Sequence, residues 1–485
     1  MNGLDQFILN NDFEFGSKNY DDDLHTDILF YRASCSLIKD YVGNCHNNMI
    51  AFHRNFVSAF YYSHSKTKDL CEKILMLLQD DEFFGSFEQK YKAACADLEK
   101  CWDSKLLSEL EHYELQYECQ KQMYKYCWPF EILQTQYGIE YAITNMLKLN
   151  GISEEQIKNI IYENELNDDN VYYQEKLEIK DICDYIEQRP DLKIIFENSL
   201  KHIVILLPAE LRKKINVIVE KYKYLYYHGY SDRKLPNIYD YIIKIKEGLL
   251  EPIFIEKRLH PDNSKLDSRI QRLLECYQKL SALKSIRRLA QLKNFYYLDR
   301  FIQVLADKHG VPESVIRYMT PEEVIDFYKT GEYNKEIENR INGVVYSWQD
   351  SQEKILTVGE DITYYESLLT NNECVSKQFF KGKIVCRGIV QGKVLKILRL
   401  DNSIKVNKNS IILTHEGDPD LLPMIKKAGA IVCEQGGITC HMAIIAREYG
   451  IPCLIGVGNN VINTFKNGDQ VEVDAINGYL KRRRL

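Results

Sequence analysis

The chain has 485 residues, which is enough for two or three domains that each bury a core. Its 63 Lys and Arg against 70 Asp and Glu leave a formal charge of -7, which argues against a globally basic face that grips nucleic acid. No apolar run approaches the roughly 18 residues that a membrane-spanning helix needs, so we expect no membrane partner.

Cysteine use and the start of the chain predict a cellular compartment. The 14 cysteines are scattered without a C-x-x-C pair, and the first residues lack the charged, apolar and small-residue regions of a secretory signal. We therefore expect a reduced, cytoplasmic protein. The basic run at residues 481–484 is most simply a solvated tail, and we expect no nucleic-acid partner.

Residues 1–369 have the pattern of a mainly helical body. Residues 68–79, 86–102 and 105–126 carry apolar side chains at helical intervals between charged ones, and no proline occurs before Pro129. Most of residues 20–370 should therefore be helix. Long helices of this kind pack as bundles or layers.

One segment of the body, residues 264–300, is rich in basic side chains spread over several turns. Two interpretations stay open: a solvated helix face with i,i+4 ion pairs, or a surface that contacts an anionic group. For the second interpretation, the candidate substrate-binding residues are Arg287, Arg288, Lys293 and Arg300.

Glycine use changes near residues 365–380. Residues 1–377 contain 12 of the 24 glycines, and the much shorter segment 378–485 contains the other half. Short apolar runs at residues 393–398, 410–414, 430–433 and 470–474 predict strands, and residues 419–427 and 441–449 have helical patterns. The prediction is an α+β multidomain protein: a helical body at residues 1–369, a linker at 370–378 and a compact α/β domain at 379–485.

The most informative motif is GGITCHMAIIAREYGIP, at residues 436–452. Gly436 and Gly437 let the backbone approach a ligand closely, and the uncapped N–H groups at a helix start attract an anion. His441 stands at the start of the predicted helix, where a phosphate-carrying imidazole would lie. Thr439 is either a hydroxyl donor to that phosphate or a helix cap, and Gly450 and Pro452 end the helix.

This string resembles the phosphohistidine signature of the swivelling domain in the phosphoenolpyruvate-utilising enzymes. That family includes pyruvate phosphate dikinase, phosphoenolpyruvate synthase and rifampin phosphotransferase. The resemblance extends through residues 381–397 and 411–437 and covers about the last 108 residues. It implies that His441 is phosphorylated in each turnover. Residues 310–340 resemble the end of the helical substrate-binding domain of rifampin phosphotransferase.

Several positions depart from the family pattern or need a role. Cys386 and Arg387 stand where the family usually has Ser-Pro, and Met442 replaces an alanine, so we expect a larger side chain beside the reacting nitrogen. Arg447, six positions after His441, should face a neighbouring element rather than the phosphate. Asp418 and Asp420 are better explained as caps or turn residues than as ligands, so we predict no metal site.

The family normally adds an ATP-grasp domain that charges the histidine, and no stretch here is similar to its glycine-rich ATP-binding segment. The resemblance therefore implies a dikinase-like phosphotransferase component. His441 would carry a phosphoryl group from a separate ATP-grasp partner, which binds ATP and Mg2+, to a small molecule held by the body. Two alternatives stay open: a non-catalytic binding or regulatory module that retains the fold, and a biosynthetic enzyme whose body pocket performs other chemistry. Phosphoenolpyruvate as donor is also open.

Overall fold

The chain divides into two compact units, Met1–Thr370 (unit 1) and Asn371–Leu485 (unit 2). The computed structural model describes residues 3–20, 22–102, 109–133, 137–165, 170–227, 229, 233–250, 253, 263–349, 351–370, 379–397, 404–415, 421–434, 441–458 and 461–483. Apart from Thr370, the predicted linker at 370–378 lies outside these residues. The predicted fold class, an α+β multidomain protein, is confirmed.

Unit 1 is mainly helical. Its first helical elements are α1 (Gly3–Leu9), α2 (Leu24–Arg32), η1 (Ala33–Leu37), α3 (Lys39–Val42), α4 (His64–Leu77), α5 (Asp81–Lys100), α6 (Leu110–Ile132), α7 (Ile139–Leu149) and α8 (Glu154–Glu165). The helical elements that follow are α9 (Val171–Glu187), α10 (Pro190–Phe196), α11 (Leu200–Leu206), α12 (Ala209–Tyr222), η2 (Lys223–Tyr226), α13 (Ile238–Leu250), η3 (Asn263–Lys265), α14 (Ser268–His309), α15 (Glu313–Arg317), α16 (Pro321–Thr330), α17 (Ile337–Arg340), η4 (Gly359–Asp361) and α18 (Ile362–Thr370).

Unit 1 also contains an antiparallel sheet that was not predicted. Its order is β1-β3-β2-β4-β5, from β1 (Phe13–Tyr20), β2 (Asn48–Arg54), β3 (Val57–Ser63), β4 (Val344–Gln349) and β5 (Gln352–Thr357). Central β2 is buried along almost its whole length. A strand that is buried on both faces has a continuous run of apolar residues. Periodicity cannot distinguish such a run from a short buried helix, so the sequence pattern did not identify this strand.

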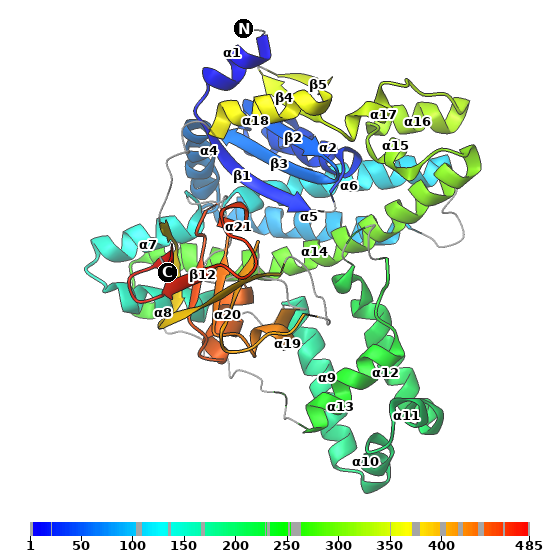
Figure 1. Ribbon diagram of the computed structural model, residues 1–485, viewed down its shortest axis with the longest axis vertical. Helices are drawn as coiled ribbons and strands as arrows, with labels where there is room; N and C mark the ends of the chain where they lie inside the picture. The colour runs from blue at the N-terminus through cyan, green and yellow to red at the C-terminus, as the bar shows by residue number, and fades with distance from the viewer. Residues whose placement is uncertain are drawn as a thin grey trace. The chain divides into compact units, whose positions relative to one another are not determined.

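The sheet of unit 1 joins the two ends of that unit. Phe52 of β2 lies opposite Val345 of β4, so strands from both ends pair directly. One face of the sheet packs on α1 and α18 through a cluster that includes Phe7, Phe52 and Ile362 (Figure 1). The other face packs on the helical layer.

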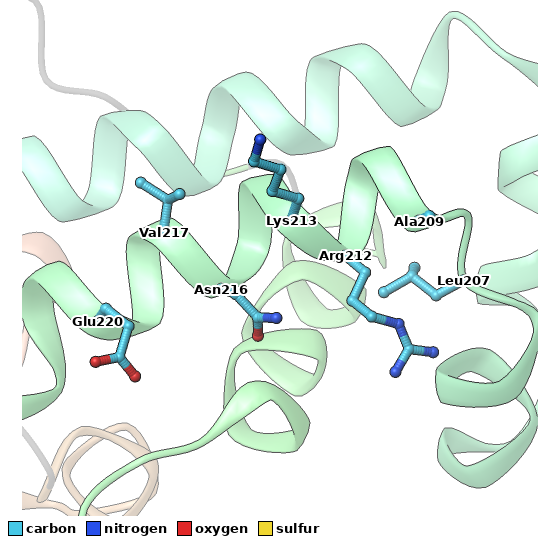
Figure 2. Close-up of a pocket in the computed structure, with 7 residues that line it drawn as sticks. All are labelled: Leu207, Ala209, Arg212, Lys213, Asn216, Val217 and Glu220. Carbon is cyan, nitrogen blue, oxygen red and sulfur yellow. The ribbon is translucent and has the colours of Figure 1, made fainter.

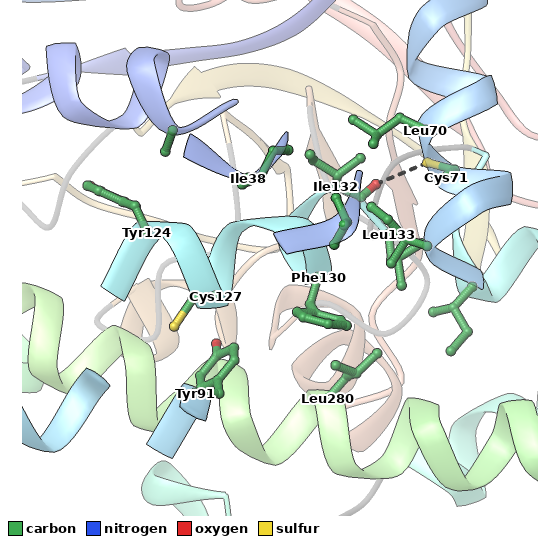
Figure 3. Packing of buried hydrophobic residues seen from close by; sticks show 14 of the residues in the cluster. Ile38, Leu70, Cys71, Tyr91, Tyr124, Cys127, Phe130, Ile132, Leu133 and Leu280 are labelled. Carbon is green, nitrogen blue, oxygen red and sulfur yellow. Dashed lines mark hydrogen bonds between the residues drawn. The ribbon is translucent and has the colours of Figure 1, made fainter. Parts of the chain in front are cut away.

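The helical layer buries the largest core of the chain. Figure 3 shows Cys127 and Phe130 of α6 beside Tyr91 of α5 and Leu280 of α14. The ring of Phe130 stacks on Phe87 with centroids 3.4 Å apart. Helix α14 spans 42 residues and crosses this core, and it ends at Gly310, whose φ of 65° is left-handed. Helices α9–α13 enclose a separate apolar cluster.

Unit 2 is built on an eight-stranded sheet of order β6-β13-β12-β8-β9-β10-β11-β7. Strands β8, β9, β10 and β11 are parallel to one another, and the outer strands pair antiparallel. The strands are β6 (Phe379–Lys381), β7 (Lys383–Cys386), β8 (Ile389–Lys396), β9 (Ser410–Thr414), β10 (Ala430–Cys433), β11 (Cys453–Ile455), β12 (Gln470–Asp474) and β13 (Tyr479–Arg482). The helices are α19 (Leu422–Ile425), α20 (His441–Glu448) and α21 (Val461–Thr464).

Both faces of this second sheet are covered. Alternate residues of β9 and β10 belong to different clusters: Ile411 and Val432 pack with residues of α21, whereas Ile412 and Ile431 pack with residues of α19 and α20. Strands buried on both sides are typical of parallel sheets with crossover helices. The four predicted strand segments and the helix predicted at 441–449 are confirmed, with shifts at their ends. Of the helical segment predicted at 419–427, residues 422–425 form α19, and residues 419 and 420 lie outside the described residues.

Candidate functional site

The candidate site lies where the parallel strands of unit 2 end. Strands β9 and β10 are parallel, so their carboxyl ends share one edge of the sheet. Helix α20 connects β10 to the parallel strand β11, and it therefore starts at this edge. Ligands in open α/β sheets bind outside the carboxyl ends of the strands.

His441 is the first residue of α20, as predicted. Its side chain, together with the predicted phosphate-binding residues Gly436, Gly437 and Thr439, lies outside the described residues, as do Asp418 and Asp420. Their roles therefore stay predictions.

Helix α20 is anchored by the residue that follows His441. Met442, Ala443, Ile445 and Ala446 are at most 3% exposed and belong to the core beneath the helix. Tyr449, which follows the last residue of α20, is 43% exposed. Met442 therefore contributes to the core beneath α20. Because the side chain of His441 lies outside the described residues, the expected effect of Met442 beside the reacting nitrogen stays a prediction.

Truncating Met442 should loosen the base of the site. We expect Met442→Ala to lower the free energy of unfolding of unit 2 by about 2 to 5 kcal/mol, because it leaves a cavity under α20. Met442→Leu, which keeps the volume, should cost less than about 1.5 kcal/mol. Hydrogen exchange of peptides from β9 and β10, measured in the full chain, reports the stability of unit 2 independently of unit 1. Equal exchange in the two variants would contradict the packing role.

Arg447 was predicted to face a neighbouring element, and this is confirmed. Helix α20 packs on β7, and the positive charge of Arg447 acts on the thiol of Cys386 at the end of that strand. Burial raises the pKa of Cys386, and Arg447 partly offsets this rise.

A buried histidine–carboxylate pair, which was not predicted, lies at the same edge of the sheet. His415 follows β9 directly and Glu434 follows β10 directly, and His415 Nδ1 is 2.8 Å from Glu434 Oε2. The two side chains are 9% and 2% exposed. A signal existed in the sequence, because both residues come immediately after predicted parallel strands, where polar side chains converge.

The four predicted substrate-binding residues of α14 have different surroundings. Arg287 is buried and its Nε donates to Glu131 Oε1 of α6 at 2.8 Å, and Lys293 Nζ donates to the carbonyl of Glu99 at 2.8 Å. Arg288 and Arg300 are exposed. They lie 12 residues apart, about 18 Å along the helix axis. The structure therefore gives Arg287 and Lys293 partners within unit 1 and does not bring all four residues together.

A depression of about 560 Å³ lies elsewhere in unit 1, along α12. Figure 2 shows the side chains that line it along this helix: Leu207, Ala209, Arg212, Lys213, Asn216, Val217 and Glu220. None of the four candidate residues on α14 lines it. The substrate-binding role of those residues stays a prediction.

A buried ionic network surrounds Arg317 of α15. Its Nη1 donates to Asp23 Oδ2 at 3.1 Å, and its Nη2 donates to Glu313 Oε2 at 3.0 Å and also to Asp299. Arg233 also forms ion pairs with Asp299 and Glu313. Because Asp23 caps α2 and Asp299 belongs to α14, the network ties three helices together.

A second buried group of polar side chains lies next to this network. Ser58 Oγ donates to Asp22 Oδ2 at 2.6 Å, and the Tyr31 hydroxyl donates to Asp27 Oδ2 at 2.9 Å. Burial raises the pKa of both carboxyl groups, and the charge of Asp22 raises that of Asp27 further. Burial lowers the pKa of His53, which lies 2.7 Å from the Tyr31 hydroxyl, to about 3, so its imidazole is neutral at pH 7. Burial and the neighbouring carboxylate of Asp22 therefore both favour the protonated form of Asp27.

The raised pKa of Asp27 predicts the direction of a pH effect. From the ordinary Asp pKa of 3.8 up to the raised pKa of Asp27, the folded chain holds a proton that the unfolded chain has released, so stability falls as pH rises. Asp27→Asn removes this penalty. We expect it to raise the free energy of unfolding at pH 7.5 by more than about 0.5 kcal/mol, with the difference closing toward pH 4. Urea denaturation from pH 4 to 8 measures it, and parallel profiles for the two proteins would refute it.

The described residues hold no metal cluster and no membrane-spanning helix. They contain no group of three or more His, Cys, Asp and Glu side chains arranged to hold a metal ion. No helix within them is long and apolar enough to span a bilayer.

Comparisons with known proteins bear on unit 2. Residues 406–478 match the family described as PEP-utilising enzyme, mobile domain. Phosphoenolpyruvate synthase of Neisseria meningitidis is 41% identical over 98 residues, which cover 20% of this chain and 12% of that protein. The probable phosphoenolpyruvate synthase of Pyrococcus horikoshii is 30% identical over 182 residues, covering 36% and 22%. Rifampicin phosphotransferase of Bacillus cereus is 26% identical over 257 residues, covering 49% and 28%.

These matches confirm the resemblance to the phosphoenolpyruvate-utilising family. The chain spans between 12% and 28% of the length of these three relatives. The match to rifampicin phosphotransferase covers 49% of the chain and therefore extends into unit 1, because unit 2 begins only at residue 371.

Proposed function

We propose that this protein is a phosphotransferase component in which His441 accepts a phosphoryl group from a donor and delivers it to a small molecule bound by unit 1. The donor is ATP held, with Mg2+, by a separate ATP-grasp protein. Unit 2 is the carrier that moves between the two sites.

The observation that carries this proposal is the position of His441 in a domain of this family. His441 starts a helix that leaves the carboxyl edge of a parallel sheet, inside the segment that matches the mobile domain of PEP-utilising enzymes. Histidine has an ordinary pKa of about 6.5, so at pH 7 to 7.5 its imidazole is mostly neutral and nucleophilic. A nucleophilic side chain divides one difficult phosphoryl transfer into two in-line displacements.

The core beneath α20 supports the carrier role. Met442 and Ala446 fix the helix on the sheet, so the backbone N–H groups at its start hold a constant direction. Those groups favour a negative charge by about 0.3 to 1 kcal/mol when exposed and by up to about 2 kcal/mol when partly buried. This interaction offsets part of the charge that His441 gains on phosphorylation.

The role of unit 1 as the acceptor-binding body is supported by the extent of the match to rifampicin phosphotransferase, which reaches into this unit. We assign ATP and Mg2+ to the ATP-grasp protein of this proposal, since the resemblance to the family implies that an ATP-grasp domain charges the histidine. Mg2+ prefers phosphate oxygens with few protein ligands, so it would arrive with the nucleotide.

A labelling experiment tests the proposal. The full chain is incubated with Mg2+, with ATP labelled at each phosphate in turn and with ATP-grasp proteins captured from the same cells. We expect an acid-labile, alkali-stable label on unit 2 that requires the captured protein. Labelled phosphoenolpyruvate in a parallel reaction identifies the alternative donor. Absence of label with every donor would refute the carrier function and favour a non-catalytic binding module.

A further inference from the structure

Two pairs of thiols lie between helices α5 and α6 of unit 1. The Sγ atoms of Cys95 and Cys127 are 3.8 Å apart, and both side chains are at most 1% exposed. Earlier in α5, Phe87 stacks on Phe130 of α6. Contacts further along α5 therefore fall further back along α6, so the two helices are antiparallel.

This antiparallel arrangement brings a second pair of thiols together near the end of α5. Cys101 ends α5, six residues after Cys95, and Cys119 lies on α6, eight residues before Cys127. Each of these steps is about two helical turns. Cys101 and Cys119 pack in the same apolar cluster. The interface therefore contains two thiol pairs that have the same chemistry and join the same two helices.

The two pairs differ in how easily an oxidant reaches them. Cys119 is half-buried, whereas Cys95 and Cys127 are enclosed in the largest core of the chain. Burial raises the pKa of Cys101, and the neighbouring thiol of Cys119 raises it further; burial also raises the pKa of Cys127. The thiolate is the form that reacts, so such thiols react slowly. Of these four thiols, Cys119 is therefore the one that an oxidant in solution meets first.

We propose that Cys119 and Cys101 are a redox site, which forms a reversible disulfide when the chain meets hydrogen peroxide. The Cys119 sulfur attacks one peroxide oxygen, the O–O bond breaks, and the leaving hydroxide takes the thiol proton and departs as water. Cys119 is then a sulfenic acid. The Cys101 sulfur attacks the Cys119 sulfur and expels a second water. The two thiols lose two electrons and two protons, and the peroxide becomes two molecules of water.

The position of this pair gives the disulfide a consequence for α14. The carbonyl of Glu99, in the last turn of α5, accepts from Lys293 Nζ at 2.8 Å. Trp102, which directly follows Cys101, donates through Nε1 to Asn294 Oδ1 at 2.7 Å. Both Lys293 and Asn294 belong to α14. A bond that ties the end of α5 to α6 therefore also restrains the contact between α5 and α14.

The disulfide is thus a means of redox control over the part of α14 that holds Lys293, one of the predicted substrate-binding residues. The bond also closes the chain between Cys101 and Cys119 into a ring, which restricts the unfolded chain. Oxidation should therefore make this part of unit 1 more rigid. None of these steps depends on phosphoryl transfer by His441, so this inference does not rest on the proposed function.

Mapping the disulfides of the full chain tests the site. The reduced chain is treated with hydrogen peroxide in native buffer, samples are taken over time, free thiols are blocked with N-ethylmaleimide, and unreduced digests are analysed by mass spectrometry. We expect a cross-linked peptide that contains Cys101 and Cys119, about 2 Da lighter than the sum of its parts because two hydrogens are lost. It should form at least about 10-fold faster than the peptide that joins Cys95 to Cys127, and dithiothreitol should reverse it.

The buried pair supplies the matched control. Cys119→Ala should abolish the rapid cross-link, whereas Cys95→Ala should leave its rate unchanged. Cys101→Ala should leave Cys119 as a sulfenic acid that dimedone traps, because the second thiol is missing. Hydrogen exchange of peptides from α14 should slow when the unchanged chain is oxidised and should not slow in Cys119→Ala.

The map of the unchanged chain decides the proposal even if a variant does not fold. Oxidation of Cys119 without a bond to Cys101 would overturn the redox site, and so would equal rates for the two pairs. A disulfide that forms as expected but leaves the exchange of α14 unchanged would overturn the control of α14.

Discussion

His441→Ala is expected to abolish the phosphoryl adduct on unit 2 and, with it, transfer to any acceptor. Alanine has no nucleophile, and the transfer depends on forming a bond between phosphorus and the imidazole nitrogen. The variant should stay folded, because the buried residues that anchor α20 are Met442, Ala443, Ile445 and Ala446. Labelling should therefore fall to background without a change in the thermal midpoint.

His202→Ala is the control for this loss. His202 is exposed on α11, with Ser199 Oγ 2.9 Å from its Nδ1, and it should keep full labelling. If the label persists in His441→Ala, the nucleophile is a residue other than His441. Biological activity that persists without any label would instead support the alternative of a binding or regulatory module.

The largest expected effect on stability is that of Arg317→Met. The change leaves Asp23 and Asp299, each with a side chain 3% exposed, without the guanidinium that bridges them. Removing one partner of a buried ion pair typically costs 3 to 5 kcal/mol, because the remaining charge stays buried. We expect a loss of about this size in the free energy of unfolding of unit 1, measured by urea denaturation followed by tryptophan fluorescence.

An exposed ion pair provides the comparison. Arg54 pairs with Glu360 at 3.0 Å, with side chains 38% and 80% exposed. Arg54→Met should change stability by less than about 1 kcal/mol, as solvent screens such pairs. If Arg317→Met and Arg54→Met cost the same, the network around Arg317 does not hold α2, α14 and α15 together.

The sequence predicted those helices and strands whose positions are marked by a local pattern of residues. The strands at Ser410–Thr414 and Ala430–Cys433 are short apolar runs between turn residues, and the helix that starts at His441 has a glycine pair before it and Gly450 after it. These signals are local, and the structure has each element where it was predicted. The family motif added a role for His441 that spacing alone would not have supplied.

Long-range pairing was beyond the reach of the same patterns. One of the two strands that pair with β2 in unit 1 is the distant β4, and nothing in either segment identifies the other. The ion pair of Arg287 with Glu131 shows the same limit at a candidate site: the basic segment was visible, but its partner on α6 was not. His415 and Glu434 were within reach, because each follows a predicted strand, yet only the parallel register brings their side chains together.

The pairing of β2 with β4 also bears on how the chain is made. Val344 is synthesised 290 residues after Arg54, which takes roughly 15 to 60 s at the usual 5 to 20 residues per second. During that interval the side of β2 that later binds β4 has unsatisfied backbone groups, and such edges recruit other strands. The growing polypeptide should therefore need a chaperone on the ribosome, and shortened forms that stop before Val344 should aggregate.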